Sequence, residues 1–181
     1  MKKIWVGIGA IALNEYWCRK HRDEARKDIF SLCRQRSYQL NKPLLVIGRP
    51  DGWTNKREVQ AGDGVTWWRK GAHPCGDFTV DIRPKGNSQC PNYIQTSAED
   101  LSMFPNQFFG ATFSSCTLEH VPDAPKAFKE IQRVTDQQGA IGIVRPQPYS
   151  LFAWLFPEHR WVIFKNSNGN PFFHRLSSPK I

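Results

Sequence analysis

The sequence predicts an α/β fold with a mostly parallel sheet, helices on both faces and an antiparallel hairpin at the C-terminus. Short apolar stretches alternate with helical or long connecting segments from residue 43 onwards, which is the pattern of strands joined by crossovers. The first stretch, residues 44–47 (LLVI), is apolar at every position, as expected of a strand buried on both faces of a parallel sheet.

The remaining elements follow from the same kind of pattern. Further strands are expected at residues 78–82, 93–96, 111–115 and 140–144, a short helix at 150–156, and a hairpin made of 160–165 and 172–176. A helix that ends at about Val134 is predicted because apolar residues from Val121 to Val134 recur at helical spacing. Asp123 is placed to cap this helix, Pro125 lies in its first turn, and Gly139 follows its end.

Positive charge is concentrated at the N-terminus. The chain has 181 residues and a net charge of +9, and residues 1–42 hold ten Lys/Arg against four Asp/Glu, a net +6. A groove for nucleic acid across the whole α/β region is therefore not favoured. We divide the chain into an apolar and basic segment (1–20), a basic amphipathic helix (21–42) and an α/β domain (43–181). The helix is expected either to cover the sheet or to lie on a membrane.

Residues 4–17 are apolar up to Leu13 and are followed by a basic cluster. As a helix they would span about 21 Å at 1.5 Å per residue, against about 30 Å for a hydrocarbon core. Three interpretations stay open: a short or half-inserted transmembrane anchor, a buried helix packed on the domain, and a signal peptide. An anchor would leave the domain cytoplasmic, with residues 4–27 facing a membrane surface.

Five scattered cysteines show no metal-ligand spacing, so the sequence predicts no metal site. Reduced thiols in a cytoplasmic compartment are expected, with a Cys75–Cys90 bridge as the alternative. Because parallel sheets bind ligands at the carboxyl ends of their strands, the segments expected to form a site are 48–52, 81–84, 97–100 and 115–120.

Three segments in the second half of the chain share one resemblance. They read Ser97-Ala98-Glu99-Asp100-Leu101, then PNQFF at 105–109, then LEHVPD at 118–123, and the match continues in register through 127–139. This combination resembles class I S-adenosylmethionine-dependent methyltransferases of the type 11 group. The likeness extends over about residues 43–181 and implies a Rossmann-like methyltransferase sheet.

The resemblance implies roles for matching positions. Gly48 and Gly52 would let the backbone approach S-adenosylmethionine, and Asp81 would bind its ribose hydroxyls. Residues flanking the adenine would be Ser97, Ala98 and Glu99, whereas Ser115 and Cys116 would face the methionine part and the substrate. Glu119 and His120 are the candidate catalytic pair, with a role in shaping the start of the helix as the alternative.

The first loop departs from the family pattern. It reads VIGRPDG at residues 46–52, with Pro50 in place of the middle glycine and Val46 in place of the preceding acid. Proline has no N–H and a fixed φ, so this backbone cannot approach a cofactor in the usual way. Two functions therefore stay open: methyl transfer from S-adenosylmethionine to an unidentified acceptor, and a non-catalytic binding or scaffold domain of the same fold tethered to a membrane.

Overall fold

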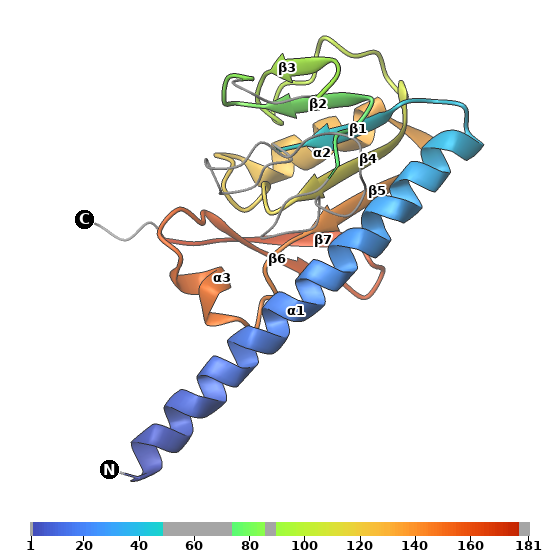
Figure 1. Cartoon of the computed structure of the whole chain (residues 1–181). Helices are drawn as coiled ribbons and strands as arrows, with labels where there is room; N and C mark the ends of the chain where they lie inside the picture. Colours follow the sequence, from blue (N-terminus) through green and yellow to red (C-terminus); the bar gives the residue numbers. More distant parts are fainter. Residues whose placement is uncertain (1, 49–73, 86–89, 178–181) are drawn as a thin grey trace.

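A five-stranded parallel sheet forms the centre of the molecule (Figure 1). The computed structural model describes residues 2–48, 74–85 and 90–177. The strands lie in the order β3-β2-β1-β4-β5, a Rossmann-like arrangement, and a separate antiparallel hairpin, β6-β7, follows. The bounds are Leu44–Ile47 (β1), Phe78–Asp81 (β2), Tyr93–Gln95 (β3), Phe109–Ser115 (β4), Thr135–Val144 (β5), Trp161–Lys165 (β6) and Pro171–Arg175 (β7). The predicted fold class is confirmed.

Strand β1 is the central strand of the sheet, and this position explains why all its residues are apolar. Val46 lies between Thr79 of β2 and Phe113 of β4. All four side chains of β1 are buried, but they belong to two different cores. Leu44 and Val46 pack with α1, whereas Leu45 and Ile47 pack with α2 and the hairpin. A strand covered on both faces needs apolar residues at every position, as the sequence predicted.

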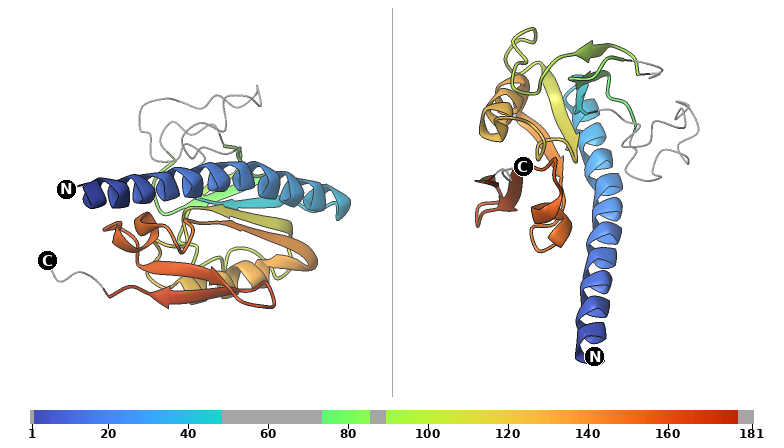
Figure 2. Two further views of the ribbon diagram at one scale, coloured as in Figure 1. Left: turned by 90° about the horizontal axis from the view of Figure 1, so that it is seen from below. Right: turned by 90° about the vertical axis from the view of Figure 1, so that its left-hand side faces the viewer.

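Helix α1 (Lys2–Gln39) covers one face of the sheet with its C-terminal half (Figure 2). It is continuous across the predicted boundary at residue 20, and at 1.5 Å per residue its length is about 57 Å. The residues buried against the sheet recur every three or four positions, at Arg26, Phe30, Cys33 and Ser37. The helix expected within residues 21–42 thus forms the C-terminal half of α1, and it covers the sheet.

The N-terminal half of α1 projects beyond the sheet (Figure 1). Its described large apolar side chains are exposed: Ile11, Leu13, Tyr16 and Trp17. The expectation of a buried N-terminal helix is therefore wrong for residues 11–17. Polar contacts hold this part to the short helix α3 (Leu151–Leu155), because Glu15 accepts hydrogen bonds from the Ser150 hydroxyl at 2.7 Å and the Leu151 amide at 2.6 Å. None of the described helices is long and apolar enough to cross a membrane.

Helix α2 (Ala124–Val134) covers the other face. The Asp123 carboxylate caps it by accepting a hydrogen bond from the Lys126 amide at 3.0 Å, as predicted. The prediction for Gly139 is wrong, because the helix ends at Val134 and the chain enters β5 at once. A Cβ at Gly139 would lie 2.7 Å from the Gly110 carbonyl oxygen, next to a shift in the β4–β5 register. The glycine therefore permits close strand approach.

A disulfide joins Cys75 to Cys90, so the expectation that all thiols are reduced is wrong. It links the segments that lead into β2 and β3. The spacing of the cysteines did not predict it, because the two residues meet only once β2 and β3 pair. Cys18, Cys33 and Cys116 are free thiols. Reduced thiols can therefore no longer be used as an argument that the protein is cytoplasmic.

Candidate functional site

The carboxyl ends of β1, β2, β3 and β4 lie next to one another at one edge of the sheet. The Gly48 amide donates to the Val80 carbonyl at 2.8 Å, and the Thr96 amide donates to the Asp81 carbonyl at 3.0 Å. On the other side, the Thr117 hydroxyl lies 3.3 Å from the Ile47 carbonyl oxygen. We call this edge the carboxyl rim; it contains Gly48, Asp81, Ser97 and Cys116. Four segments that are distant in sequence are thus brought together, as the strand-end argument predicted.

Gly48 is a glycine for two structural reasons. Its φ is +99°, a conformation that side chains disfavour. A Cβ there would also lie 2.2 Å from the Thr117 hydroxyl oxygen. The missing side chain therefore lets the Thr117 side chain pack against the end of β1. Gly52 and the Pro50 departure lie outside the described residues.

Asp81 ends β2 with its carboxylate at the rim. The side chain is 8% exposed and is bound by Arg83, whose backbone amide and Nε reach Oδ1 at 2.8 and 3.0 Å and whose Nη2 reaches Oδ2 at 2.9 Å. Arg83 is itself 46% exposed at the side chain, so it can turn into solvent. A ribose hydroxyl would therefore share the carboxylate with Arg83 or displace its guanidinium.

The loop after β3 is tied to the start of α2. The Ser97 hydroxyl accepts from the Glu99 amide at 3.2 Å and donates to Glu99 Oε2 at 3.0 Å. The other Glu99 oxygen accepts from the Asp123 amide at 2.7 Å. Ala98, between them, is buried. These contacts fix the loop beside Asp81, so Glu99 serves the loop's structure whether or not it also touches a ligand.

A buried arginine from α1 reaches the end of β4. Arg26 is 1% exposed, and its Nε donates to the Ser115 hydroxyl at 2.9 Å while Nη1 reaches Asp23 at 2.8 Å. The Cys116 sulfur lies 3.9 Å from Nη2. Cys116 has a φ of +50°, which is uncommon for a residue other than glycine, and strained backbone of this kind clusters at functional sites. Burial raises the pKa of its thiol to about 11.

Glu119, His120 and His159 form a group just beyond the end of β4. One carboxylate oxygen and one nitrogen of each ring lie within 4.8 Å of one another. The hairpin brings His159 there, because the Arg160 and Trp161 amides both donate to the Glu119 carbonyl, at 2.7 and 3.2 Å. Sequence reasoning had named Glu119 and His120 as catalytic candidates and expected no metal ligands.

Burial shifts the pKa of two members of this group. It raises the pKa of the Glu119 carboxyl, and the neighbouring His120 and Arg22 and a contact with the Cys116 thiol offset part of that effect. Burial lowers the pKa of His159 to about 4, so this ring is neutral at pH 7. The pKa of Arg145 is lowered by burial as well, although the nearby Glu119 opposes that change.

Sequence reasoning missed Arg26 and His159 at this edge. Arg26 had counted only toward the basic excess of the N-terminal segment. Its place in the stripe with Phe30 and Cys33 could have suggested burial, since the three recur at helical spacing. No local signal marks His159, because its position depends on how the hairpin docks.

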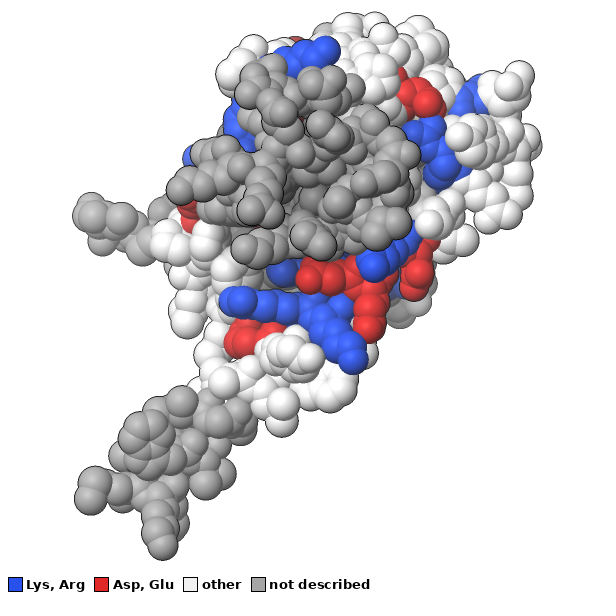
Figure 3. All heavy atoms as spheres, in the orientation of Figure 1, with Lys and Arg blue, Asp and Glu red and all other residues white. Residues whose placement is uncertain are grey.

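Charge on the face that carries α1 is mixed rather than uniformly basic (Figure 3). Basic and acidic side chains lie together over the middle of the helix, where Asp23 makes ion pairs with Arg22 and Arg26. Residues 1–42 still carry a net +6, but charges of both signs are interspersed on this face.

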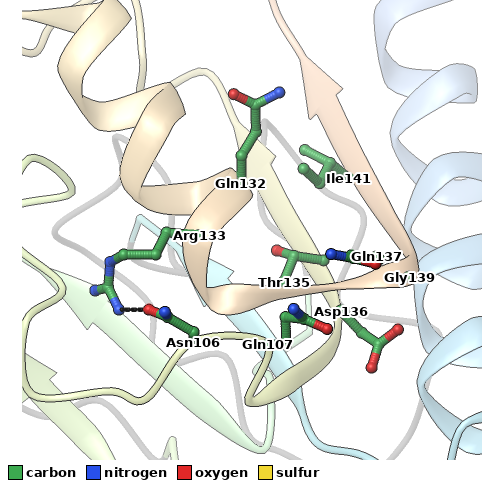
Figure 4. A pocket seen from close by; sticks show the side chains of 9 residues that line it. All are labelled: Asn106, Gln107, Gln132, Arg133, Thr135, Asp136, Gln137, Gly139 and Ile141. Carbon is green, nitrogen blue, oxygen red and sulfur yellow. Dashed lines mark hydrogen bonds between the residues drawn. The ribbon is translucent and has the colours of Figure 1, made fainter.

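A depression of about 490 Å³ lies at the opposite, amino edge of the sheet (Figure 4). Its lining includes Arg133 at the end of α2 and Asp136 and Gly139 of β5. Arg133 points to Asn106, with Nη1 2.9 Å from the amide oxygen. These side chains are bound to one another and to backbone carbonyls, and none of the residues predicted for the site lines this depression.

Residues 77–143 match a family model described as a methyltransferase domain, which confirms the resemblance over β2–β5. Among solved structures, an S-adenosylmethionine dependent methyltransferase from Mesorhizobium loti is similar at 14% sequence identity with a TM-score of 0.42. The alignment covers 73% of this chain but 56% of that enzyme, so this chain spans little more than half of its length. No curated protein matches the chain.

Proposed function

We propose that this chain, which matches a methyltransferase domain over residues 77–143, binds S-adenosylmethionine at the carboxyl rim and transfers a methyl group to a small acceptor. The observation that carries the proposal is the alignment of four strand ends. It puts Gly48, the Asp81 carboxylate and the Ser97 loop on one edge. The acceptor is not identified by any feature of the rim.

The rim residues fit the cofactor in their chemistry. A carboxylate such as Asp81 can accept hydrogen bonds from both ribose hydroxyls. Gly48 and the Ser97 loop lie beside it at the ends of the neighbouring strands. When bound, S-adenosylmethionine supplies a methyl group on a sulfonium, which is already a good electrophile.

The protein's main task is then orientation. Holding two reactants in a reactive geometry is worth several kcal/mol, roughly 7–11 in the best cases. Such a reaction does not require a strong general base when the acceptor is already nucleophilic. Glu119 and His120 lie beyond β4 and are proposed to shape this side of the rim rather than to move a proton.

Calorimetry with the full chain tests the proposal. We expect S-adenosylmethionine to bind with a micromolar Kd, and Asp81→Asn to weaken binding by at least about tenfold, since a hydrogen bond to a charged group contributes roughly 1.5–3 kcal/mol. Arg83→Met is the matched control, because it releases the same carboxylate and should leave binding unchanged or tighter. Absence of binding at millimolar cofactor would contradict the proposal.

The second candidate is a non-catalytic domain of the same fold, and the placement of Arg26 favours it. The guanidinium is bound to Ser115 and lies next to Cys116, the positions expected to face the methionine part of the cofactor. In this case Arg26→Met would restore cofactor binding that the wild-type chain lacks.

Membrane tethering through residues 4–27 belongs to the second candidate. The exposed apolar side chains of Ile11, Leu13 and Trp17 support it. Flotation with anionic vesicles tests it, with an Ile11→Glu, Leu13→Glu variant as the comparison. Equal flotation of both proteins, or of neither, would exclude the tether.

A further inference from the structure

The group Glu119, His120 and His159 has the composition of a metal centre. We propose that these three side chains bind one divalent transition-metal ion, for which Zn²⁺ is the probe of choice. A carboxylate with two imidazoles is a donor set of zinc enzymes and of non-haem iron(II) sites. This site is distinct from cofactor binding and does not depend on it.

The hydrogen bonds of the two rings orient them as metal ligands. His120 Nδ1 lies 3.1 Å from the Glu158 carbonyl oxygen, and His159 Nδ1 lies 3.1 Å from the Ala153 carbonyl oxygen. A carbonyl oxygen can only accept, so each Nδ1 carries the proton, and in the neutral ring the lone pair is on Nε2. Metal-binding histidines are commonly held in this way, with the other nitrogen donating to a backbone carbonyl.

Glu119 supplies the second, independent observation. Its side chain is 2% exposed, and within the described part of the chain neither carboxylate oxygen has a hydrogen-bond partner. A buried ionised carboxylate without partners is costly, so such groups are normally paired or bound to a metal. The oxygen that belongs to the group lies within 4.8 Å of a nitrogen of both rings.

The spacing fits an open site that closes on binding. Donor atoms about 2.1 Å from one zinc ion in tetrahedral geometry are roughly 3.4 Å apart. A pair of donors separated by 4.8 Å must therefore approach by about 1.4 Å. Rotations of the Glu119 and histidine side chains allow such a movement. Three protein ligands leave at least one coordination position, which would take water or an oxygen or nitrogen donor of a small molecule.

Arg22 of α1 places a positive charge near this site, which disfavours binding of a metal cation. Arg22 is close enough to lower the pKa of both Glu119 and His159, and its buried Nε has no hydrogen-bond partner within the described part of the chain. Arg22 also makes an ion pair with Asp23, its Nε lying 3.8 Å from Oδ1. The site therefore competes with a nearby cation for Glu119, and Arg22→Gln should tighten metal binding. An anionic ligand in the same place would be weakened by that substitution, which separates the two cases.

Titration of the metal-stripped full chain with Zn²⁺ tests the proposal. We expect one ion per chain, at least about tenfold weaker binding in Glu119→Gln and in His159→Gln, and tighter binding in Arg22→Gln. His21→Gln is the matched control, because it removes an exposed histidine that pairs with Glu24 elsewhere on α1. Co²⁺ should give no sulfur-to-metal charge-transfer absorption, since no thiolate is among the proposed ligands.

A second readout uses the wild-type chain alone. Zn²⁺ should shift the NMR signals of the His120 and His159 rings and leave those of His21 and His174 in place. This measurement decides the matter even if a substituted chain fails to fold. No stoichiometric binding, equal affinity in the three histidine and glutamate variants, a thiolate absorption with Co²⁺, or shifts confined to other histidines would each overturn the proposal.

Discussion

The two edges of the sheet differ in whether their polar groups have hydrogen-bond or ion-pair partners. At the amino edge, where the strands begin, Arg34 binds both oxygens of Asp77 at 2.8 Å, and Lys42 pairs with Asp136. At the carboxyl end, buried polar atoms of Arg22, Ser114 and Glu119 have no hydrogen-bond partner among the described residues.

Unsatisfied buried polar atoms are few in folded proteins and call for a reason. The amino edge holds the ion pairs Arg34–Asp77, Lys42–Asp136 and Glu130–Arg133 and the Cys75–Cys90 disulfide, which we together call the clamp. Asp81 and Ser97 of the carboxyl rim are hydrogen-bonded, but the buried atoms of Arg22, Ser114 and Glu119 near this end are not satisfied among the described residues. We infer from this difference that the amino edge contributes more to stability and that the carboxyl end is the better candidate for a ligand.

The largest effect expected at the amino edge comes from the disulfide. Replacing both Cys75 and Cys90 by serine should lower the free energy of unfolding by about 3 kcal/mol, because the bridge closes a loop of about 15 residues in the unfolded chain. Urea unfolding measures this loss, and a reducing agent should lower the stability of the wild-type chain by a similar amount. If reduction leaves the free energy of unfolding unchanged, the disulfide does not stabilise the amino edge.

The reactivity of the Cys33 thiol in the core can be compared with that of the Cys116 thiol at the rim. Burial raises the pKa of Cys33 and of Cys116 to about 11. Below that value each thiolate is scarcer than in an ordinary cysteine, so alkylation at pH 8 should be slower by about 100-fold than in the unfolded chain. Added S-adenosylmethionine should slow Cys116 further and leave Cys33 unaffected. Equal protection of both thiols would contradict a ligand at the rim.

The same substitution at the two edges should have opposite signs. Glu130→Gln removes the partner of Arg133, whose Nε and Nη2 lie 2.8 Å from the two carboxylate oxygens, and should cost about 1 kcal/mol of unfolding free energy. Glu119→Gln removes a buried charge without a partner and should leave stability unchanged or raise it. Urea unfolding of the two variants side by side is the measurement. A larger loss at Glu119 than at Glu130 would show that the rim carboxylate is stabilising.

The pH dependence of the clamp follows from the same pair. Hydrogen bonding to Arg133 lowers the pKa of Glu130 below its ordinary value. A carboxyl whose pKa is lowered by folding adds stability that is fully present above the unfolded pKa, and that stability is lost as pH falls through the folded value. The stability difference between wild type and Glu130→Gln should therefore shrink in acid. A difference that stays constant down to the lowest pH at which the chain folds would contradict this.

The sequence predicted the fold well because the signals for its elements are local. The unbroken apolar run of β1 and the capping position of Asp123 lie within a few residues of what they specify. The rim was predicted because strand ends of a parallel sheet must share one edge. Arg26 and His159 were not found, since each depends on how a distant element docks.

Two errors have the same physical origin. The Cys75–Cys90 disulfide depends on the pairing of β2 with β3, and the role of Gly139 depends on how closely β5 approaches β4. Both are contacts between segments that no spacing along the chain reveals. The Cys75–Cys90 pair was named only as the alternative, because nothing in the sequence places β2 beside β3.

We expect S-adenosylmethionine to bind at the carboxyl rim and not in the depression at the amino edge. Amide NMR of the full chain during a titration with the cofactor tests this directly. Signals of Gly48, Asp81, Ser97 and Cys116 should shift, whereas those of Gln107 and Gly139 should stay unchanged. Shifts at the amino edge instead, or none at millimolar cofactor, would contradict it.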